Sequence, residues 1–430
     1  MKRYDSYKDS GIEWIGEIPS HWEIATVGRL CILGRGRVIS AIEIAENEGV
    51  YPVYSSQTEN YGIMGKINTY DFEGEYVTWT TDGANAGTVF YREGKFNCTN
   101  VCGTIQPKNW KQIDLKFLPY YLNLGTKFSV RLDINPKLMN NMMAKIPIAI
   151  PPISEQTSIA SFLDRKTSEI DDIIADKKRL LELYEEEKTA IINQAVTKGI
   201  DPDAPMKDSG IEWLGEIPEH WEVKKIKHLL KKKKGALKTG PFGSQLKNSD
   251  LDSSGEFKVY TQRNVLDNDF IVGDDKINEV KFQTLKEFLI EEGDILFTSR
   301  GTIGVCNVFP ADSEPGILHP CLIRIQIDRN RLNQDWIINY VNNSSLFIDN
   351  VKYESNATTI EVIYGGTLKE TALPVPPIQE QQSIVHHFES ECSKIDFKKA
   401  RTEELIELLT EYRTALISEA VTGKIKVTED

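Results

Sequence analysis

Polar side chains of the types that read DNA bases gather in two stretches of the chain, among β-branched and aromatic runs with Gly, Asn and Asp turns. In the first stretch they are Ser55, Ser56, Gln57, Thr80, Thr81, Asp82 and Asn85. In the second stretch they are Gln245, Gln262, Arg263, Asn264, Ser299 and Arg300. Arg pairs with guanine, and Asn or Gln with adenine, through two hydrogen bonds. These residue types predict base contacts from strand-end loops, and ordinary solvated loops remain the alternative.

A lysine cluster precedes the second group of polar residues. Seven of the 11 residues from 224 to 234 are lysine, at positions 224, 225, 227, 231, 232, 233 and 234. Clustered lysines are typical of surfaces that contact DNA phosphates, although a charge run can also be a solvated face. Arg35, Arg37, Lys247 and Thr302 complete the predicted set of DNA contacts, with Lys231, Lys232, Lys233 and Lys234 as its phosphate-binding members.

Catalytic motifs are missing from the sequence. It has no G-x-x-x-x-G-K-[ST] loop, no H-E-x-x-H helix and no G-x-S-x-G elbow, and the GRGRVI sequence at 34–39 lacks the third glycine of a dinucleotide turn. An Asn-Pro-Pro-aromatic or Asp-Pro-Pro-aromatic stretch is also absent. Cys98 and Cys102 alone do not supply the four ligands of a structural zinc site. We therefore predict no catalytic residue and no metal, and a binding module that lends specificity to enzymes it carries.

The sequence repeats itself. KDSGIEWIGEIPSHWEI, from Lys8 to Ile24, recurs as KDSGIEWLGEIPEHWEV from Lys207 to Val223, with 14 of 17 positions identical. A second repeat relates PPISEQ from Pro151 to PPIQEQ from Pro376. The order is a short motif, a variable block and a helical block, and then all three again. An internal repeat of this kind predicts two similarly built halves.

The helical blocks show apolar residues at three-and-four spacing. We expect helices after each Pro-Pro pair, with Ser154 as the N-cap of the first. The predicted packing residues are Ile170, Ile173, Leu180, Tyr184 and Ile191 in the first block and Ile395, Leu405, Leu409 and Leu416 in the second. Lys177, Glu187, Lys398 and Thr402 interrupt this seam. Two such helices packed antiparallel would bury each other's stripe and form a rod of about 45 Å, although each could instead pack on its own domain.

Length, charge and composition set the outer limits. A chain of 430 residues predicts two or three domains. The net charge of −13 argues at first against nucleic acid, but the acidic excess lies in the repeated segments, which leaves the variable blocks free to be locally basic. Six scattered cysteines, no apolar run near 18 residues and no signal-peptide pattern predict a cytoplasmic protein with reduced thiols and no membrane contact.

The motif, its second copy, the two PPI-x-EQ helix starts and the closing AVTKGI and AVTGKI sequences resemble the DNA specificity subunit of Type I restriction-modification systems. Four tryptophans lie in the doubled motif: Trp14, Trp22, Trp213 and Trp221. EEGDILFTSRGTIG is similar to a phrase that recurs in such subunits, whereas the first block has only the looser YVTWTTDGANAGTV. The resemblance covers the whole chain in order.

The resemblance implies an α+β fold in which two globular mixed α/β target recognition domains are held apart by two long antiparallel conserved helices, with a pseudo-twofold internal repeat. Residues 1–150 would be the first recognition domain with its motif, and 151–206 the central conserved helical region. Residues 207–373 would be the second recognition domain with the second motif, and 374–430 the distal conserved helical region.

The resemblance also implies partners and a function. The chain would bind double-stranded DNA at a bipartite, asymmetric target and recruit two modification subunits, which use S-adenosylmethionine to methylate adenine. Up to two restriction subunits, with ATP and Mg, would be optional partners, and the chain itself would hold no cofactor and be no enzyme. A two-domain transcription regulator and a scaffold without a DNA role remain alternatives. Co-purification with an adenine methyltransferase would separate the three.

Overall fold

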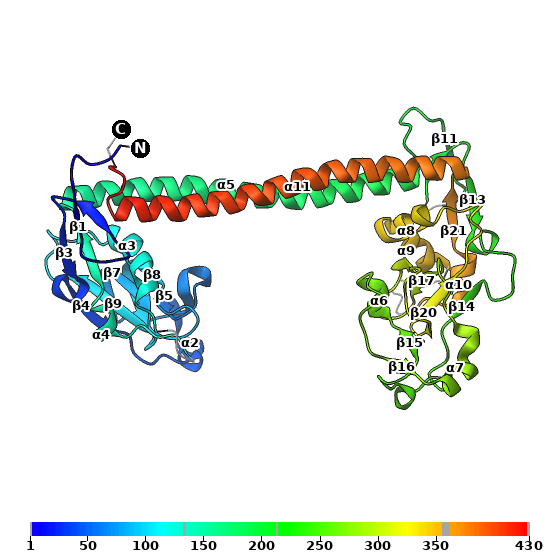
Figure 1. Cartoon of the computed structure of the whole chain (residues 1–430), viewed down its shortest axis with the longest axis horizontal. Helices are drawn as coiled ribbons and strands as arrows, with labels where there is room; N and C mark the ends of the chain where they lie inside the picture. The colour runs from blue at the N-terminus through cyan, green and yellow to red at the C-terminus, as the bar shows by residue number, and fades with distance from the viewer. Residues whose placement is uncertain (1, 132–134, 212–213, 355–361, 428–430) are drawn as a thin grey trace. The chain divides into compact units, whose positions relative to one another are not determined.

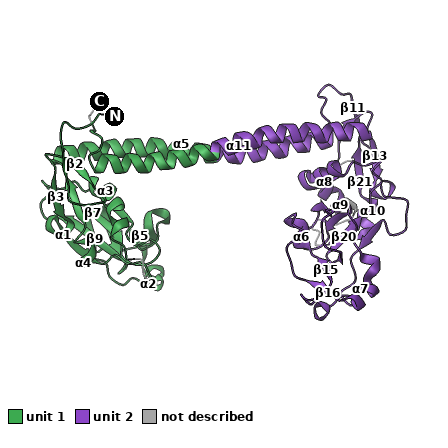
Figure 2. Ribbon diagram, viewed as in Figure 1, with its two compact units in different colours: residues 1–178, 403–430 green, residues 179–402 purple. Residues whose placement is uncertain are grey.

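The computed structural model describes residues 2–131, 135–211, 214–354 and 362–427. Trp213 of the second motif copy lies outside these residues. The chain forms two compact units (Figure 2): unit 1 is Met1–Lys178 with Glu403–Asp430, and unit 2 is Arg179–Thr402. Both contain helices and sheets, which confirms the α+β class. The predicted segment limits at 150, 206 and 373 stay predictions.

Unit 1 is built around a six-stranded sheet (Figure 1). Its elements up to the first long helix are β1 Tyr7–Asp9, β2 Glu17–Pro19, β3 Glu23–Thr26, α1 Val27–Leu30, β4 Cys31–Arg35, α2 Ala41–Glu46, β5 Glu48–Tyr54, η1 Glu59–Gly62, β6 Ile63–Ile67, β7 Phe72–Thr80, β8 Val89–Cys98, β9 Cys102–Pro107, α3 Phe117–Gly125, η2 Thr126–Phe128, α4 Asn140–Met143 and β10 Pro147–Ile150. The sheet order is β4-β9-β7-β8-β5-β6. Only the β5–β8 pair is parallel among the pairs in this sheet.

The core of unit 1 lies between this sheet, α3 and the start of the long helix. Trp79 of β7 is fully buried, and its indole nitrogen donates a hydrogen bond to the carbonyl of Leu138 at 2.8 Å. The apolar residues of α3 recur with helical spacing, so that Phe117, Tyr121 and Leu122 all face this core. This packing fixes the strand ends that carry the first group of polar candidates.

Unit 2 contains a four-stranded sheet, β14-β20-β17-β18, and a three-stranded sheet, β16-β15-β19. Its elements before the second long helix are β11 Met206–Asp208, β12 Glu216–Pro218, β13 Glu222–Lys225, η3 Ile226–His228, β14 Leu237–Thr239, η4 Asn248–Asp250, β15 Phe257–Tyr260, α6 Gln262–Leu266, β16 Lys276–Ile277, α7 Glu279–Leu285, η5 Lys286–Phe288, β17 Ile295–Thr298, β18 Cys306–Val308, β19 Gly316–Leu318, β20 Leu322–Ile325, α8 Gln334–Asn343, α9 Ser345–Glu354, α10 Gly365–Glu370 and β21 Ala372–Val375. The sheets of the two units differ in strand number and order, as the unalignable variable blocks predicted.

The repeated motif folds the same way in both units. β1 pairs with β2, and β11 pairs with β12, in matching antiparallel register. The strand that follows each motif pairs with the strand before each long helix, β3 with β10 and β13 with β21. Trp22 and Trp221 are fully buried. The internal repeat is therefore confirmed. We call each copy, the motif hairpin with the strand pair before the long helix, a mount.

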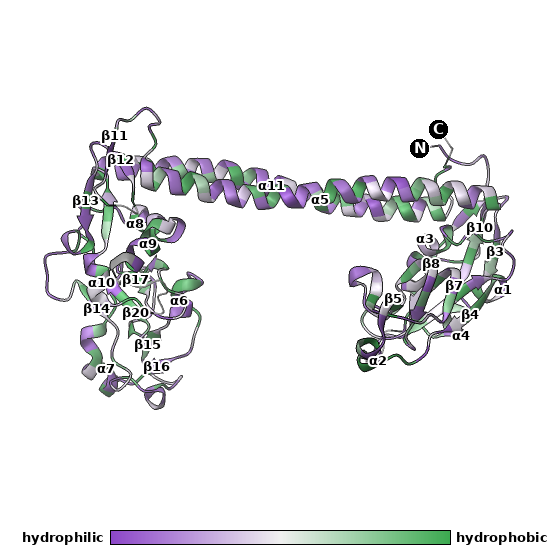
Figure 3. Ribbon diagram, turned by 180° about the vertical axis from the view of Figure 1, so that it is seen from behind, coloured by the Kyte–Doolittle hydropathy of each residue, from purple (hydrophilic) through white to green (hydrophobic). Residues whose placement is uncertain are grey.

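The long helices are α5 Ile153–Lys198 and α11 Ile378–Val421. They pack antiparallel within each unit. Two ion pairs show this direction: Asp171 with Arg413 in unit 1 at 2.8 Å, and Lys188 with Asp396 in unit 2 at 2.7 Å. Figure 3 shows hydrophobic and hydrophilic residues alternating along both helices. Ser154 is not the N-cap: the helix begins at Ile153, and the Pro152 carbonyl accepts the amide of Gln156. No helix among the described residues is long and apolar enough to cross a membrane.

The helix seam is more regular than predicted. In α5 the buried or half-buried positions include 170, 174, 177, 181, 184, 188, 191 and 195, and in α11 they include 395, 399, 402, 406, 409, 413, 416 and 420. Both sets alternate steps of four and three, the heptad pattern of paired helices. Ile170, Tyr184, Ile191, Ile395, Leu409 and Leu416 belong to it as predicted, and Leu180 is half-buried beside it.

Two packing predictions are wrong. Ile173 and Leu405 are 43% and 40% exposed, and the neighbouring Ile174 and Ile406 take the seam positions. The predicted interruptions also shift: Glu187 and Lys398 are exposed, whereas Lys177 and Thr402 lie in the seam. The apolar stripe is wide enough to include two adjacent residues, and only the partner helix selects the one that is covered.

Candidate nucleic-acid interface

The first polar group of unit 1 gathers where β4 and β7 end. Arg35 is the last residue of β4, and its guanidinium nitrogen Nη2 lies 3.5 Å from the Thr81 hydroxyl and 3.6 Å from a carboxylate oxygen of Asp82. Its Nε donates to the carbonyl of Asn100, in the turn between β8 and β9. Three segments far apart in sequence therefore meet at one end of the sheet, as the predicted set requires.

The loop after β5 joins this edge. The side chain of Asn85 donates to the carbonyl of Ser56 at 3.2 Å, and Gln57 donates to the carbonyl of Ile63. Ser55, Ser56 and Gln57 are partly or fully exposed. Tyr61, at the tip of the same connection, is 75% exposed with a φ of 52°. A bulky residue at positive φ is rare, so Tyr61 is a candidate contact that the sequence pattern did not reveal.

Arg37 is engaged by two carboxylates. Its guanidinium lies 2.6 Å from Glu43 and 2.9 Å from Asp71. The hydrogen bond to Glu43 raises the pKa of the Arg37 side chain, and the same bond lowers the pKa of Glu43. The charge of Arg37 is locally balanced in this structure. It stays a predicted DNA contact, and it would have to exchange these partners for phosphate or base atoms.

Four predicted contacts are corrected because their side chains are buried. Thr80 and Thr81 are at most 1% exposed, under the turn that leads into β9. Asn264 is buried in a capping box, where it accepts the amide of Thr261 and donates to the carbonyls of Asp269 and Val272. Ser299 is 2% exposed at the end of β17. These groups support the loops and are removed from the direct base-contact set.

The second polar group lies at one end of the four-stranded sheet of unit 2. The amide of Ser299 donates to the carbonyl of Cys321, just before β20, and the amide of Gly240 donates to Leu322. The loop after β17 and the loop after β14 therefore emerge side by side. Gln262, at the start of α6, donates to the carbonyl of Thr302 at 2.9 Å.

This strand end brings together five exposed or partly exposed candidates: Gln245, Gln262, Arg263, Arg300 and Thr302. Gln245 accepts the amide of Phe242 at 2.8 Å, and Arg263 lies 3.2 Å from Asp267. Arg300 is exposed, and its side chain has no hydrogen bond or ion pair with the described residues. An exposed guanidinium near a Gln amide is suited to read base edges. Lys247 is exposed just after this loop.

Two aromatic residues at this end were missed from the sequence. Phe242 is 79% exposed in the loop after β14, and Tyr364 is 66% exposed before α10. The amide of Ile363 donates to the carbonyl of Ser299, which places the Tyr364 segment next to the Arg300 loop. Phe242 stands between prolyl and glycyl neighbours in GPFGSQ, a turn signal that would have suggested an exposed aromatic.

The part of the lysine cluster from Lys231 to Lys234 lies at the other end of β20, whereas Lys224 and Lys225 lie in β13, which pairs with β21. The amide of Lys231 donates to the carbonyl of Gln326, just after β20, whereas Ser299 bonds Cys321 just before it. Cys321 and Gln326 are five residues apart, so at about 3.4 Å per residue these ends are roughly 17 Å apart. The predicted phosphate contacts and base contacts of unit 2 are therefore two separate surfaces. We call residues 231–235 the lysine loop.

Several cluster lysines already have acidic partners. Lys225 and Lys227 lie 2.9 and 2.7 Å from Glu370. The hydrogen bond from Lys227, followed by that from Lys225, lowers the pKa of Glu370 to about 2. Lys224 pairs with Glu222. Lys231, Lys232 and Lys234 are exposed and form no ion pair with the described residues. The free positive charge is concentrated in the lysine loop.

The described residues contain no group of three or more His, Cys, Asp or Glu side chains arranged to hold a metal ion. Cys98 and Cys102, which flank the turn beside Arg35, are both buried. The hydrogen bond with Cys102 and burial raise the pKa of the Cys98 thiol. The strand ends of the two units offer hydrogen-bond donors and acceptors and positive charge, which are the groups that bind nucleic acid.

Comparisons with known proteins agree on one family. A family model, Type I restriction modification DNA specificity domain, matches residues 19–183 and 218–407. The MpnII Type I restriction enzyme specificity subunit of Mycoplasma pneumoniae is 42% identical over 168 residues, 38% of this chain and 50% of that protein. The MjaVIII specificity subunit of Methanocaldococcus jannaschii is 24% identical over 95% of this chain and 94% of its own. The chain spans about half the length of several curated relatives that it matches.

Two solved structures share the fold. The HsdS subunit from Thermoanaerobacter tengcongensis has a TM-score of 0.58 at 13% identity, over 95% of this chain and 98% of its own. A structure solved for the complex assembly and conformational transition of the type I R-M system has a TM-score of 0.64 at 14% identity, over 95% of this chain and 99% of the other. At these identities the likeness concerns the fold alone.

Proposed function

The chain belongs to the family of Type I restriction-modification DNA specificity subunits, and from that premise we propose that it reads a bipartite, asymmetric DNA target and delivers modification subunits to it. Unit 1 would read one half of the target and unit 2 the other. The family match leaves the alternative of a transcription regulator without support.

One observation carries this proposal: the same mount holds two unlike sheets, and each sheet presents polar side chains at one end. Arg35, Gln57 and Asn85 belong to the edge of unit 1, and Gln262 and Arg300 to that of unit 2. The repeated motif would attach each sheet to its long helix in the same way. The different sheets would then present different side chains to two half-sites of different sequence. Base edges in the major groove are read by these side-chain types.

The family of specificity subunits implies the partners. Two modification subunits would bring S-adenosylmethionine and methylate adenine in each half-site, and restriction subunits would add ATP, Mg and cleavage. The paired helices supply a long solvated surface that such subunits can contact. The complex would act in the cytoplasm, where the DNA and reduced thiols are.

Co-expression with an adenine methyltransferase encoded beside it tests the proposal. We expect the two proteins to co-purify and methylated-base mapping of the host DNA to return a split motif with different half-sites. A chain that binds no methyltransferase, or a methylated motif that is symmetric, would contradict the assignment of one half-site to each unit.

A further inference from the structure

The lysine loop is an excursion from the unit 2 sheet that two backbone hydrogen bonds close. The amide of Lys231 donates to the carbonyl of Gln326 at 2.8 Å, and the amide of Gln326 donates to the carbonyl of Ala236 at 2.7 Å. Since both ends of the segment bond the same residue, the residues between them leave the sheet. Gly235 turns the chain back with a φ of 82°, a conformation that favours glycine.

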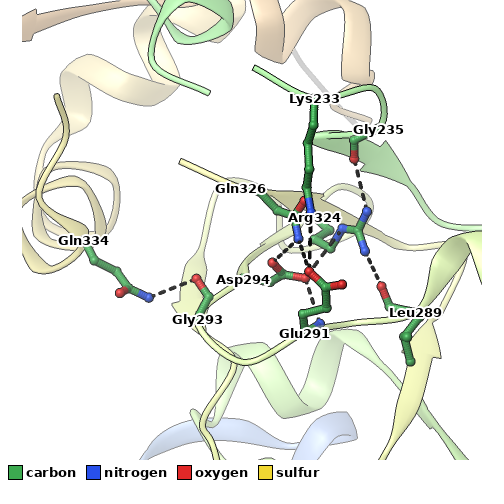
Figure 4. A network of polar contacts seen from close by, with 9 residues as sticks. All are labelled: Lys233, Gly235, Leu289, Glu291, Gly293, Asp294, Arg324, Gln326 and Gln334. Atoms are coloured by element: carbon green, nitrogen blue, oxygen red, sulfur yellow. Dashed lines mark hydrogen bonds and ion pairs between the residues drawn. The ribbon is translucent and has the colours of Figure 1, made fainter. Parts of the chain in front are cut away.

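A buried arginine holds the base of this loop (Figure 4). The guanidinium of Arg324 donates from Nη2 to the carbonyl of Gly235 at 3.1 Å and from Nη1 to the carbonyl of Leu289. Its Nε lies 3.6 Å from a carboxylate oxygen of Asp294, and the two side chains are 9% and 2% exposed. One buried cation thus ties the lysine loop to the turn that precedes β17.

A second chain of contacts reaches the loop through Gln326. Its side-chain amide donates to Asp294 at 2.7 Å and to Glu291 at 2.9 Å. The same Glu291 oxygen lies 3.5 Å from the ammonium group of Lys233. The hydrogen bond from Gln326 lowers the pKa of Glu291, so this carboxylate remains charged beside Lys233. Lys233 is therefore anchored, and its three lysine neighbours remain available.

Burying the Arg324–Asp294 ion pair costs free energy of desolvation. Taking two charges out of water carries a desolvation penalty that apolar residues of similar volume avoid. Arg324 lies in β20 between the buried Ile323 and Ile325, opposite Leu296 of β17 and Lys238 of β14, and Asp294 directly precedes β17. One of the Arg324 hydrogen bonds ends on the lysine loop, at the carbonyl of Gly235, and the other ends on the carbonyl of Leu289. The specific consequence of keeping the pair is that the loop is held against the turn before β17.

We propose that Arg324, supported by Asp294 and Gln326, is a positioning residue that holds the lysine loop as a preformed site for DNA phosphates, separate from the base-reading end of the same sheet. This inference rests on the proposed function. The loop presents Lys231, Lys232 and Lys234 about 17 Å from the Arg300 end, a span of roughly five base pairs at about 3.4 Å each. The phosphates it contacts would lie roughly five base pairs from the bases that Arg300 reads.

The test measures the affinity of the full chain, in complex with its modification subunits, for target DNA as salt concentration is raised. Each phosphate contact contributes about 0.9 to the slope of log affinity against log salt. Replacing Lys231, Lys232 and Lys234 by glutamine is expected to reduce the magnitude of this negative slope by about 2 to 3. Arg324→Met is expected to reduce the magnitude by at least about 1, with unchanged preference among target bases. The slope does not depend on the fraction of active protein, so a purely structural role would leave it unchanged.

Lys286→Gln is the control, since Lys286 is exposed in unit 2 and lies outside the loop; its slope should equal that of the wild type. If Arg324→Met fails to fold, Arg324→Lys decides, because a single ammonium group keeps the buried charge but cannot bond both carbonyls in the same way. An unchanged slope in the folded Arg324 variant, or in the triple lysine variant, overturns the inference. If the wild-type complex neither binds nor methylates DNA selectively, the proposed function itself fails.

Discussion

The indole nitrogen of Trp22 donates a hydrogen bond of 3.0 Å to Glu155, and 199 residues later Trp221 donates one of 3.0 Å to Glu380. Both tryptophans are fully buried, and both glutamates lie in the first turn of a long helix. Each bond fastens a repeated motif to the helix that follows its own sheet. The repeated sequence therefore preserves the same Trp–Glu contact in both units.

The end of the other helix completes each mount. A Cβ placed on Gly423, just after α11, would lie 2.4 Å from Pro19 and 3.0 Å from Trp22. A Cβ on Gly199, just after α5, would lie 3.4 Å from Trp221 and 3.8 Å from Pro218, which is ordinary contact. The closing AVTKGI and AVTGKI sequences both pass beside an indole ring, and only the approach at Gly423 is too close for a side chain. Both glycines have positive φ values, which a side chain would strain.

We predict that Glu155→Ala lowers the free energy of unfolding by about 1–3 kcal/mol, because the buried indole N–H of Trp22 loses its acceptor. Glu155 also accepts from Tyr4 at 3.1 Å and from His21 at 2.7 Å, whereas Glu380 accepts from Trp221 and His220 without a tyrosine. Glu380→Ala should therefore cost less than Glu155→Ala. Urea unfolding followed by tryptophan fluorescence measures both. Equal stability of Glu155→Ala and wild type would contradict the role of the bond.

We predict unequal effects of two leucines on the second long helix. Leu416→Ala is expected to cost about 2–5 kcal/mol, since Leu416 is 2% exposed in the core of unit 1. Leu405→Ala should change stability by less than about 0.5 kcal/mol, since Leu405 is outside the seam. The pair serves as its own control in thermal or urea unfolding. A larger cost for Leu405 than for Leu416 would restore the seam predicted from periodicity.

We predict that Arg300→Ala weakens target binding by about 1–3 kcal/mol and relaxes selectivity in one half-site only. The reason is the exposed guanidinium after β17, which has no hydrogen bond or ion pair with the described residues. Arg329→Ala is the matched control, because Arg329 is an exposed arginine of unit 2 that bonds Gln334 at 2.9 Å and lies outside the predicted contacts. Binding to DNA libraries with each half-site randomised separates the two. Intact selectivity at every base in Arg300→Ala would end its assignment as a base contact.

We predict an acid-dependent contribution from Glu370. Its folded-state pKa of about 2 is below its ordinary value of 4.5, because Lys227 and Lys225 donate hydrogen bonds to it. A carboxyl with a lowered pKa stabilises the fold above its unfolded-state pKa, and this stabilisation is lost as pH falls through the folded-state value. Wild type should exceed Glu370→Gln in stability at pH 6, and the difference should shrink between pH 4.5 and 2. A difference that does not vary over this range would contradict the pairing.

The repeat, the helices and the family were accessible from the sequence because their signals are local. The doubled motif predicted two equal mounts, the Pro-Pro pairs predicted where helices begin to within two residues, and heptad spacing predicted an antiparallel pair. Ser154 failed as an N-cap because the prolyl carbonyl itself starts the helix, an outcome that only backbone geometry decides.

The sequence by itself determined which residue types could meet DNA, and the tertiary structure decided where they stand. Thr80 and Ser299 looked like exposed loop tips, yet neighbouring segments from distant parts of the chain cover them. The lysine loop and Arg300 looked like one surface, yet they lie at opposite ends of β20. The strand order β14-β20-β17 decides this, and it is set by pairings between residues 84 to 88 positions apart for β14 with β20 and 24 to 30 positions apart for β17 with β20. The type of a side chain is known from its own position in the sequence. Its burial and its neighbours depend on long-range packing that no local pattern encodes.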